Sequence, residues 1–267
     1  MLEYRRKTLR SEVEFGGVGL HSGVPVVVKI KPGDQGIRFA SGQEIVAARP
    51  ENVIDTARCT RLSVASTIEH LMSAFCGLEI TDADVELQGP ELPGLDGSSA
   101  EYVRALLEAG LTDLDLVNKP ELFRRIFLKE NGVEISAAKG HGHWRFVFDA
   151  GDRWLGRQTY ETELVIADYP EQIAPARTTA FAEEVEPARQ MGLGLGLDET
   201  SVVVIGQTRY ETPVRFPDEP ARHKLLDLMG DLYLSGLPAA ALAVVAERSG
   251  HRTNVKAAAM IVESLHQ

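Results

Sequence analysis

The order of secondary-structure signals in the first half of this 267-residue chain returns in the second half. In each half, strand-like segments precede a helix with a histidine near its start, and a further strand, a glycine-containing loop and a second helix follow. Each half therefore has a sheet and helices whose apolar faces must be buried against another layer. We expect an α+β fold of two similar domains, each a sheet with helices on one face, whose helix layers pack together as a β-α-α-β sandwich. A polar stretch at 116–121 predicts domains 1–117 and 118–267.

The clearest local signals of the first half lie near its end. Residues 66–69 (STIE) have the form of a capping box, and the apolar residues after them predict a short helix that ends at Gly77. Residues 81–88 alternate apolar and polar side chains, which is the period of a half-buried strand. A second capping box at 98–101 (SSAE) then begins a helix that ends at Gly110.

The second half follows the same order. An Asn-Gly pair at 131–132 between two apolar runs predicts a hairpin, and alternating residues predict a further strand at 160–166. A broad apolar stripe predicts a helix that starts near Pro220. The segment 239–245 is alanine-rich and suits a helix by propensity, but the parallel with the first half favours a strand. A glycine loop containing His251 and a last helix complete the half.

The charge of the chain limits its partners. The sequence has 39 acidic against 28 basic side chains, a formal charge of −11. This charge repels a phosphate backbone, so we do not expect a nucleic acid as a partner. An anionic small molecule is still compatible, because a few basic side chains that converge in one cleft suffice to bind it.

Cysteine content and hydropathy favour a cytoplasmic location. Cys59 and Cys76 are too few for a disulfide framework and lie in apolar settings, so we interpret both as packing residues in a reducing compartment. No apolar run approaches the roughly 20 residues that cross a bilayer. The basic residues near the N-terminus are not followed by the apolar core of a signal peptide.

His223, Asp227 and Asp231 are spaced four residues apart, so they share one stripe of the helix after Pro220. An imidazole and a carboxylate one turn apart can chelate a single ion, and zinc accepts both ligand types. On spacing alone, a solvated helix face or a local ion pair is the favoured alternative.

The pair Glu69-His70 is ambiguous in the same way, because Glu69 is placed to cap its own helix and His70 suits a hydrogen-bonded core histidine. The combination of features favours a metal site. Two histidines, His70 and His223, occupy equivalent points of two similar halves, and a carboxylate lies near each. Packing of one helix layer on the other brings these two histidines toward one interface.

Six motifs stand in order along the chain: 17–23 (GVGLHSG), 55–60 (DTARCT), 66–71 (STIEHL), 176–178 (ART), 222–227 (RHKLLD) and 249–251 (SGH). They closely resemble motifs of the UDP-3-O-acyl-N-acetylglucosamine deacetylases of lipid A synthesis, and the resemblance runs from Thr8 to near the C-terminus. It implies two α+β domains that sandwich their helices with one zinc ion between them. It also implies hydrolysis of the N-acetyl group of UDP-3-O-acyl-N-acetylglucosamine to the free amine and acetate, the committed step of lipid A synthesis.

By these motifs, the resemblance implies that His70, His223 and Asp227 bind Zn²⁺ and that water takes the open fourth position, as in catalytic zinc sites. Zinc lowers the pKa of such a water to about 7 and polarises the amide carbonyl. Glu69, next to a ligand, is then expected to be the general base. In that case its capping role is secondary or absent, because one carboxylate cannot point both ways.

Three further positions match catalytic residues of the family. Thr178 matches the donor to the oxyanion, and losing one such donor typically costs about 3 to 4 kcal/mol of barrier. His251 matches a histidine that, when protonated, either stabilises developing charge or protonates the leaving amine, and both roles stay open. Asp231 is expected to orient His251 and to raise its pKa.

The resemblance also implies contacts with the substrate. Lys224 is expected to face the substrate. Arg248 is expected to meet the diphosphate, unless it is plain surface charge. His21, in the glycine-rich turn, is expected to line the site without binding metal. The predicted substrate-binding residues are Lys224, Cys59, His21, Leu197 and Arg248.

The chain departs from the family pattern in the walls of the substrate site. Leu197 falls where a second glycine is expected beside the passage for the fatty acyl chain, and Thr179 stands where an aromatic residue is common. Residues 252–253 (RT) replace small and apolar residues. We interpret these departures as a changed acyl preference with the metal chemistry intact.

The expected partner is a UDP-linked acylated amino sugar, bound by a monomer. A lipid-bearing substrate suggests at most weak contact with the inner membrane surface, and no basic amphipathic helix favours it. Two alternatives stay open: a deacetylase of a different acylated amino sugar, and a catalytically silent homologue that binds a nucleotide sugar. Glu69, Thr178 and His251 together speak against the silent homologue, because binding alone needs no base, oxyanion donor and acid.

Overall fold

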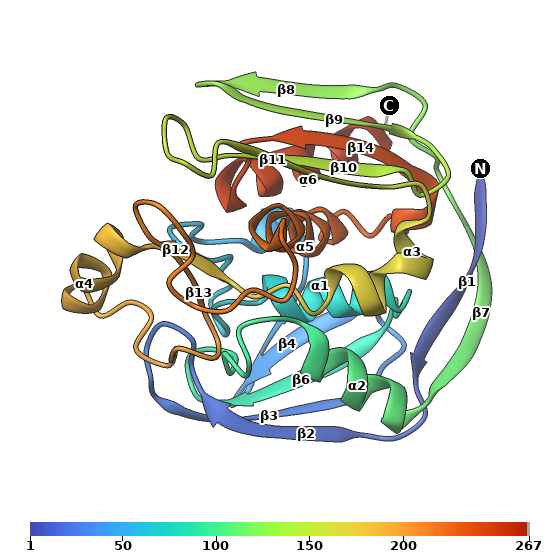
Figure 1. Cartoon of the computed structure of the whole chain (residues 1–267). Helices are drawn as coiled ribbons and strands as arrows, with labels where there is room; N and C mark the ends of the chain where they lie inside the picture. Colours follow the sequence, from blue (N-terminus) through green and yellow to red (C-terminus); the bar gives the residue numbers. More distant parts are fainter. Residues whose placement is uncertain (266–267) are drawn as a thin grey trace.

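Two five-stranded sheets enclose a double layer of helices in the computed structural model of the protein, which describes residues 1–265 (Figure 1). From the bottom to the top of Figure 1, the layers are sheet, helix, helix and sheet. This arrangement confirms the α+β fold class that the sequence predicts.

The N-terminal sheet consists, in spatial order, of β2 (Val13–Val18), β3 (Pro25–Pro32), β6 (Ala83–Gln88), β4 (Ile37–Ser41) and β5 (Glu44–Ala47). Neighbouring strands are antiparallel except β4 and β6, which are parallel. Alternate residues of these strands face the helices, and Val28, Ile30 and Val85 are fully buried there.

The C-terminal sheet consists, in spatial order, of β8 (Ile126–Glu130), β9 (Val133–Lys139), β14 (Leu242–Glu247), β10 (Trp144–Asp149) and β11 (Arg157–Thr162). Here β10 and β14 are the parallel pair. The order and directions of the strands therefore match those of the N-terminal sheet one for one. In both sheets the central strand is the last to enter, so the halves repeat one topology, as the doubled order in the sequence predicts.

The inner layers contain α1 (Glu69–Gly77), α2 (Ala100–Ala109), α5 (Glu219–Tyr233) and α6 (His251–Leu265). At the centre of the molecule, α1 packs against α5 (Figure 1). Leu71, Phe75, Leu225 and Met229 of these helices are fully buried. Because each such side chain contributes about 1.5–3 kcal/mol, apolar burial is a main force that holds the two halves together. Within residues 1–265, none of the helices has the length and apolar character that crossing a lipid bilayer requires.

A separate two-stranded ribbon runs along one side of the molecule. It pairs β1 (Leu2–Leu9) antiparallel with β7 (Leu111–Lys119). The division expected between residues 117 and 118 falls within β7, and it stays a prediction.

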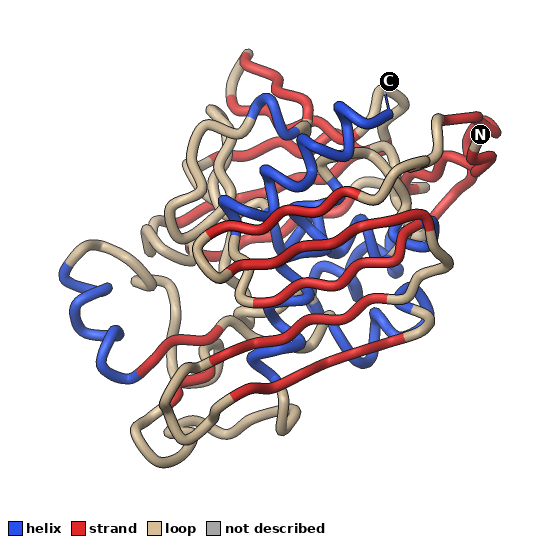
Figure 2. The backbone as a smooth tube through the Cα atoms, turned by 90° about the horizontal axis from the view of Figure 1, so that it is seen from above, coloured by secondary structure: helices blue, strands red, loops and turns tan. Residues whose placement is uncertain are grey.

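A helical arm stands away from the layers. It begins at the short strand β12 (Thr179–Phe181), continues through α4 (Ala182–Gln190) and returns along β13 (Val203–Ile205), which is parallel to β12. Figure 2 shows α4 at the edge of the molecule, apart from the strands that lie side by side over the central helices. No residue of α4 is buried.

The helix starts differ from the predicted ones. Helix α1 has no side-chain cap, so the capping box predicted at 66–69 is wrong. At the start of α2 the N-cap residue is Ser99, one residue after the predicted one, but the Ser98 hydroxyl still accepts the N–H of Ala100 over 3.1 Å. Thr67 has a φ of 58°, and the Glu69 carboxylate turns into the molecule, where it accepts a hydrogen bond from the backbone N–H of Thr60. The Ser99 hydroxyl donates to the carbonyl oxygen of His70 instead of capping α2. Helix α6 begins at His251, so this histidine lies in a first helical turn and not in a loop.

Two further segments differ in part from the strands that the sequence predicts. The strand predicted at 160–166 ends at Thr162, whose hydroxyl accepts the N–H of Leu164 and so begins a turn into α3 (Val165–Asp168). The segment 239–245 starts with the 3-10 turn Ala239–Ala241 before it becomes β14.

Candidate active site

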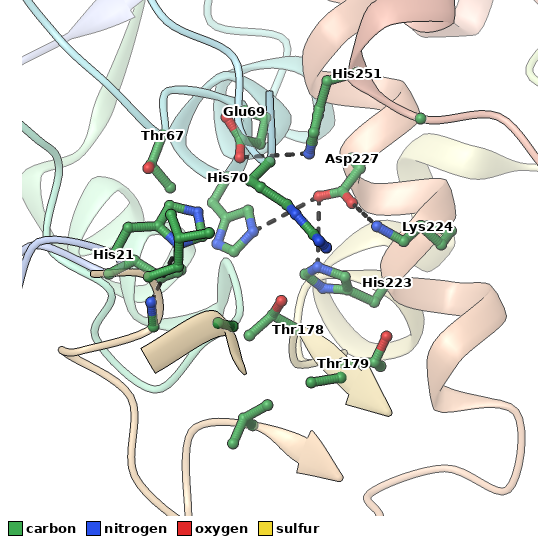
Figure 3. A pocket seen from close by; sticks show the side chains of 18 of the residues that line it. His21, Thr67, Glu69, His70, Thr178, Thr179, His223, Lys224, Asp227 and His251 are labelled. Carbon is green, nitrogen blue, oxygen red and sulfur yellow. Dashed lines mark hydrogen bonds and ion pairs between the residues drawn. The ribbon is translucent and has the colours of Figure 1, made fainter. Parts of the chain in front are cut away.

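A cavity of about 490 Å³ opens where the N-terminal parts of α1, α5 and α6 come together (Figure 3). Both halves contribute to its wall. The polar residues that line it include His21, Thr67, Glu69, His70, Thr178, Thr179, His223, Lys224, Asp227 and His251.

Three buried side chains in this cavity form a candidate metal site. The ligand atoms of His70, His223 and Asp227 all lie within 4.8 Å of one another. Asp227 Oδ1 lies 3.6 Å from His70 Nε2 and 3.5 Å from His223 Nε2. Within the described residues, this buried oxygen has no hydrogen-bond partner. An unpartnered carboxylate oxygen that faces two imidazole nitrogens fits a divalent cation, so the donor set suits a metal.

The protonation states of the three residues suit metal binding as well. Burial and the neighbouring His223 lower the pKa of His70 to about 3. Burial also lowers the pKa of His223. Burial alone would raise the pKa of Asp227, but Lys224 and the surrounding histidines outweigh it and hold the pKa well below its usual range. Neutral imidazoles and an ionised carboxylate are the forms that bind a metal ion.

The ring of His223 is fixed by its backbone neighbour. His223 Nδ1 donates to the carbonyl oxygen of Ala176 over 3.0 Å, which leaves Nε2 as the free lone pair toward Asp227. The segment that carries Ala176 is held by a buried ion pair, because the Glu219 carboxylate accepts both the backbone N–H and the guanidinium of Arg177.

Lys224 neutralises the other side of Asp227. Its Nζ lies 2.9 Å from Asp227 Oδ2, and Lys224 precedes Asp227 by one turn of α5. The two oxygens of this carboxylate therefore have different partners: Oδ2 faces a lysine and Oδ1 faces the histidines.

Glu69 is buried beside the candidate metal site. Its Oε2 accepts the backbone N–H of Thr60 over 2.9 Å, and its Oε1 lies 3.8 Å from His251 Nε2. Burial raises the pKa of Glu69 to about 7, although the nearby His251 opposes this shift. A carboxylate with a pKa near neutrality is suited to general acid–base catalysis.

His251 has the opposite polarity. Burial would lower its pKa, but Asp231 and Glu69 outweigh burial and raise the pKa to about 9, so the ring is protonated at neutral pH. His251 Nδ1 donates to Asp231 Oδ2 over 3.0 Å. The site therefore combines the Glu69 carboxyl group, whose pKa is near neutral pH, with the His251 imidazolium, which the Asp231 carboxylate orients.

The other predicted residues fall into two groups. Thr178, His21, Lys224 and Leu197 line the cavity. Cys59 and Arg248 are not among the described residues that line it.

The environments of these last two residues differ. Cys59 is buried, and burial raises the pKa of its thiol to about 12. The Arg248 side chain is half exposed, with Nη1 3.8 Å from Asp149 Oδ2.

Several supporting residues have no role in the sequence-based prediction. The Thr60 hydroxyl donates to Asp231 Oδ1, and Asn254 Nδ2 donates to Asp231 Oδ2. Glu91 accepts the backbone N–H groups of His21 and Ser22 and so fixes the glycine-rich turn. Thr60 and His21 both lie within motifs of the resemblance, but no spacing rule pointed to hydrogen bonds between segments so far apart in the sequence.

A second group of potential ligands lies on the outside of the C-terminal sheet. His143, Glu161 and Glu163 also approach one another closely enough to share an ion. Both glutamates are exposed, and His143 Nε2 already lies 2.7 Å from Glu161 Oε1. Burial and the unpartnered oxygen therefore single out the group around Asp227.

Comparisons with known proteins find similar proteins over most of the chain. The model of the UDP-3-O-acyl N-acetylglycosamine deacetylase family matches residues 6–263. A curated UDP-3-O-acyl-N-acetylglucosamine deacetylase from Anaeromyxobacter dehalogenans is 35% identical over 95% of this chain and 86% of its own length. A relative of the same name from Campylobacter lari is 37% identical over 86% of this chain and 82% of its own length. Another, from Myxococcus xanthus, is 31% identical over 95% of this chain and 85% of its own length.

Proposed function

The chain belongs to the UDP-3-O-acyl N-acetylglycosamine deacetylase family, and we propose that it hydrolyses the N-acetyl group of UDP-3-O-acyl-N-acetylglucosamine to the free amine and acetate, in the committed step of lipid A synthesis. One observation carries this proposal. A buried group of potential metal ligands, His70, His223 and Asp227, lies in the same cavity as Glu69 and His251. A base, an acid and a metal site around one cavity are what metal-assisted amide hydrolysis needs.

We propose that the metal is zinc, held by His70, His223 and Asp227. Two neutral imidazole nitrogens and one carboxylate are a common ligand set of catalytic zinc. When bound, the ion would polarise the amide carbonyl and make water available as a nucleophile at neutral pH.

Glu69 would act as the general base. Its raised pKa keeps part of the carboxylate able to accept a proton at neutral pH, and it stands next to His70 in the first turn of α1. As the water oxygen bonds to the amide carbon, its proton would pass to a Glu69 oxygen. Thr178, at the cavity wall, would donate a hydrogen bond to the oxygen of the tetrahedral intermediate.

His251 would serve the leaving group. The C–N bond breaks as the amine nitrogen takes a proton, and a protonated imidazole 3.8 Å from the Glu69 carboxylate is placed either to give that proton or to stabilise the charge that develops. Asp231 would keep the ring oriented and protonated.

The substrate contacts are part of the proposal. Lys224, His21 and Leu197 would contact the substrate from the cavity wall. Cys59 is buried behind the cavity wall and would affect substrate binding only through the loops around it. Arg248 lies on the surface and would contact only the diphosphate end of the substrate.

We also propose a monomer in the cytoplasm, in at most weak contact with the inner membrane surface. The two free, buried cysteines are in line with a reducing compartment.

The test is acetate release from UDP-3-O-acyl-N-acetylglucosamine, with metal measured by elemental analysis. We expect metal in the purified protein and a loss of turnover of about 10²- to 10⁴-fold in Glu69→Ala and in His251→Ala. Glu161→Ala, which removes an exposed carboxylate far along the sheet, is the matched control and should keep full turnover.

The alternatives predict different results. Metal without acetate release from any acylated UDP-sugar would support a silent homologue. Acetate released only from another acylated amino sugar would support the second deacetylase hypothesis. A protein that binds no metal would contradict the proposed site.

A further inference from the structure

Thr60 connects two carboxylates of the site that come from different halves of the chain. It is fully buried, at 0% exposure. Its backbone N–H donates to Glu69 Oε2 over 2.9 Å, and its hydroxyl donates to Asp231 Oδ1 over 2.5 Å. Glu69 belongs to α1 of the first half and Asp231 to α5 of the second.

These contacts close a ring of polar groups. Asp231 Oδ2 accepts His251 Nδ1 over 3.0 Å, and His251 Nε2 lies 3.8 Å from Glu69 Oε1. The ring therefore runs from Glu69 through Thr60, Asp231 and His251 back to Glu69. Thr60 is its only member for which the proposed function has no use.

The backbone around Thr60 is built to place it. Residues 55 and 61 pair in an isolated antiparallel bridge, and Arg58, between them, has a φ of 71°. An arginine in this left-handed region is strained, and such strain persists where surrounding contacts hold it. After this turn, the Thr60 carbonyl accepts the N–H of Ile68, so all three polar groups of Thr60 are used.

We infer that Thr60 is a positioning residue, whose hydroxyl fixes the Asp231 carboxylate and through it the direction of the His251 ring toward Glu69. This inference rests on the proposed function. Asp231 is itself buried, and its Oδ1 accepts the Thr60 hydroxyl while Oδ2 accepts His251 and Asn254. Without the hydroxyl, Oδ1 loses this donor and the carboxylate is free to turn about its χ2 angle, which moves the oxygen that orients His251.

Side-chain variants separate the two roles of Thr60. Thr60→Val removes the hydroxyl but keeps the shape and the backbone N–H to Glu69. Thr60→Ser keeps the hydroxyl and removes only a methyl group. We expect Thr60→Val to lower kcat about 10- to 100-fold, as for other residues that orient a catalytic group, with KM and metal content unchanged. Thr60→Ser should recover most of kcat.

A double-mutant cycle with His251→Ala gives the decisive measurement, because it reports only on effects that pass through His251. In the His251→Ala background, Thr60→Val should cause no further loss of kcat. An equal loss in both backgrounds, or wild-type kcat in Thr60→Val, would overturn the inference. If Thr60→Val does not fold, Thr60→Ala against Thr60→Ser isolates the hydroxyl in the same cycle.

The matched control is Thr162→Val. Thr162 is also buried, and its hydroxyl also donates to an aspartate, Asp168, but neither residue lines the cavity. Thr162→Val should lower stability without changing kcat. Failure of the proposed function would be visible separately, because the wild-type protein would then release no acetate at all.

Discussion

Gly230 of α5 and Glu69 of α1 meet backbone to backbone: a Cβ placed on Gly230 would lie 2.1 Å from the carbonyl oxygen of Glu69. Such a distance is far inside van der Waals contact. The two helices approach this closely at the first turn of α1, next to His70. The approach brings residues one and two turns earlier in α5, Asp227 and His223, within reach of His70.

Gly230→Ala should therefore damage both stability and the site. Alanine favours a helix over glycine by about 1 kcal/mol, but the added methyl meets backbone atoms that cannot move aside, and such overpacking typically costs about 1–3 kcal/mol. We expect a lower free energy of unfolding in urea and a loss of metal from the purified protein. Gly16→Ala is the control, because a Cβ at Gly16 meets nothing within 4 Å. Wild-type metal content in Gly230→Ala would show that the close approach is not needed for the site.

Sequence periodicity predicted the repeated topology and placed His223, Asp227 and Asp231 on one helix stripe. It could not say whether that stripe faces water. The structure buries all three side chains, so the alternative of a solvated face is wrong. Whether this stripe is buried depends on the packing of α5 against α1 and α6. The residue pattern of one helix contains no information about the helices that pack against it.

The predictions that failed share a physical cause. The capping box at 66–69 has the right residues, but Glu69 makes a tertiary hydrogen bond to Thr60 instead, and at the start of α2 the Ser99 hydroxyl bonds to the His70 carbonyl. Local preference was overruled by long-range contacts. For the same reason the sequence pattern does not single out Thr60, because its two carboxylate partners, Glu69 and Asp231, are separated from each other by most of the chain.

Metal removal should loosen the contact between the halves. The proposed ligands come from α1 and α5, so an ion there stabilises the folded state by its binding free energy. His70→Ala, or wild type dialysed against a chelator, should melt at a lower temperature than the metal-loaded protein, and zinc should restore only the wild type. His143→Ala is the control, since this partly exposed histidine lies outside the cavity. Retained metal with an unchanged melting temperature in His70→Ala would contradict the assignment.

The pH dependence of kcat/KM should be bell-shaped. Glu69 must be ionised to act as a base, so activity should fall as the pH drops through its pKa of about 7. His251 must be protonated, so activity should fall as the pH rises through its pKa of about 9. Asp231 raises the pKa of His251, and therefore Asp231→Asn should move the alkaline limb to lower pH. If the alkaline limb of Asp231→Asn stays at the pH of the wild type, deprotonation of His251 does not cause that limb.

Acid stability should depend on the ion pair between Arg6 and the buried carboxylate of Asp82, which lies outside the cavity. Asp82 is almost fully buried and accepts hydrogen bonds from Arg6, Thr81 and the backbone of Gly36. Burial would raise the pKa of Asp82, but these donors outweigh it and lower the pKa below the ordinary value of 3.8.

A lowered pKa in the folded state stabilises the protein above pH 3.8, and this stabilisation is lost as the pH falls below that value. Asp82→Asn should cost about 1.5–3 kcal/mol at neutral pH. The difference between variant and wild type should shrink in urea titrations at acid pH. A difference that does not change with pH would assign the cost to packing.

Leu197 should set the acyl length that the enzyme accepts. It lines the cavity at the base of the α4 arm, where the resemblance to the family predicts a glycine. Each methylene of an acyl chain gains about 0.8 kcal/mol when it is buried, but a side chain in its path prevents that burial. Leu197→Gly should therefore raise kcat/KM for longer acyl chains relative to shorter ones, measured by acetate release over a series of chain lengths. Leu195→Gly is the matched control, because Leu195 is exposed and absent from the cavity wall. If wild type and Leu197→Gly turn over every chain length in the same proportions, Leu197 does not select the acyl chain.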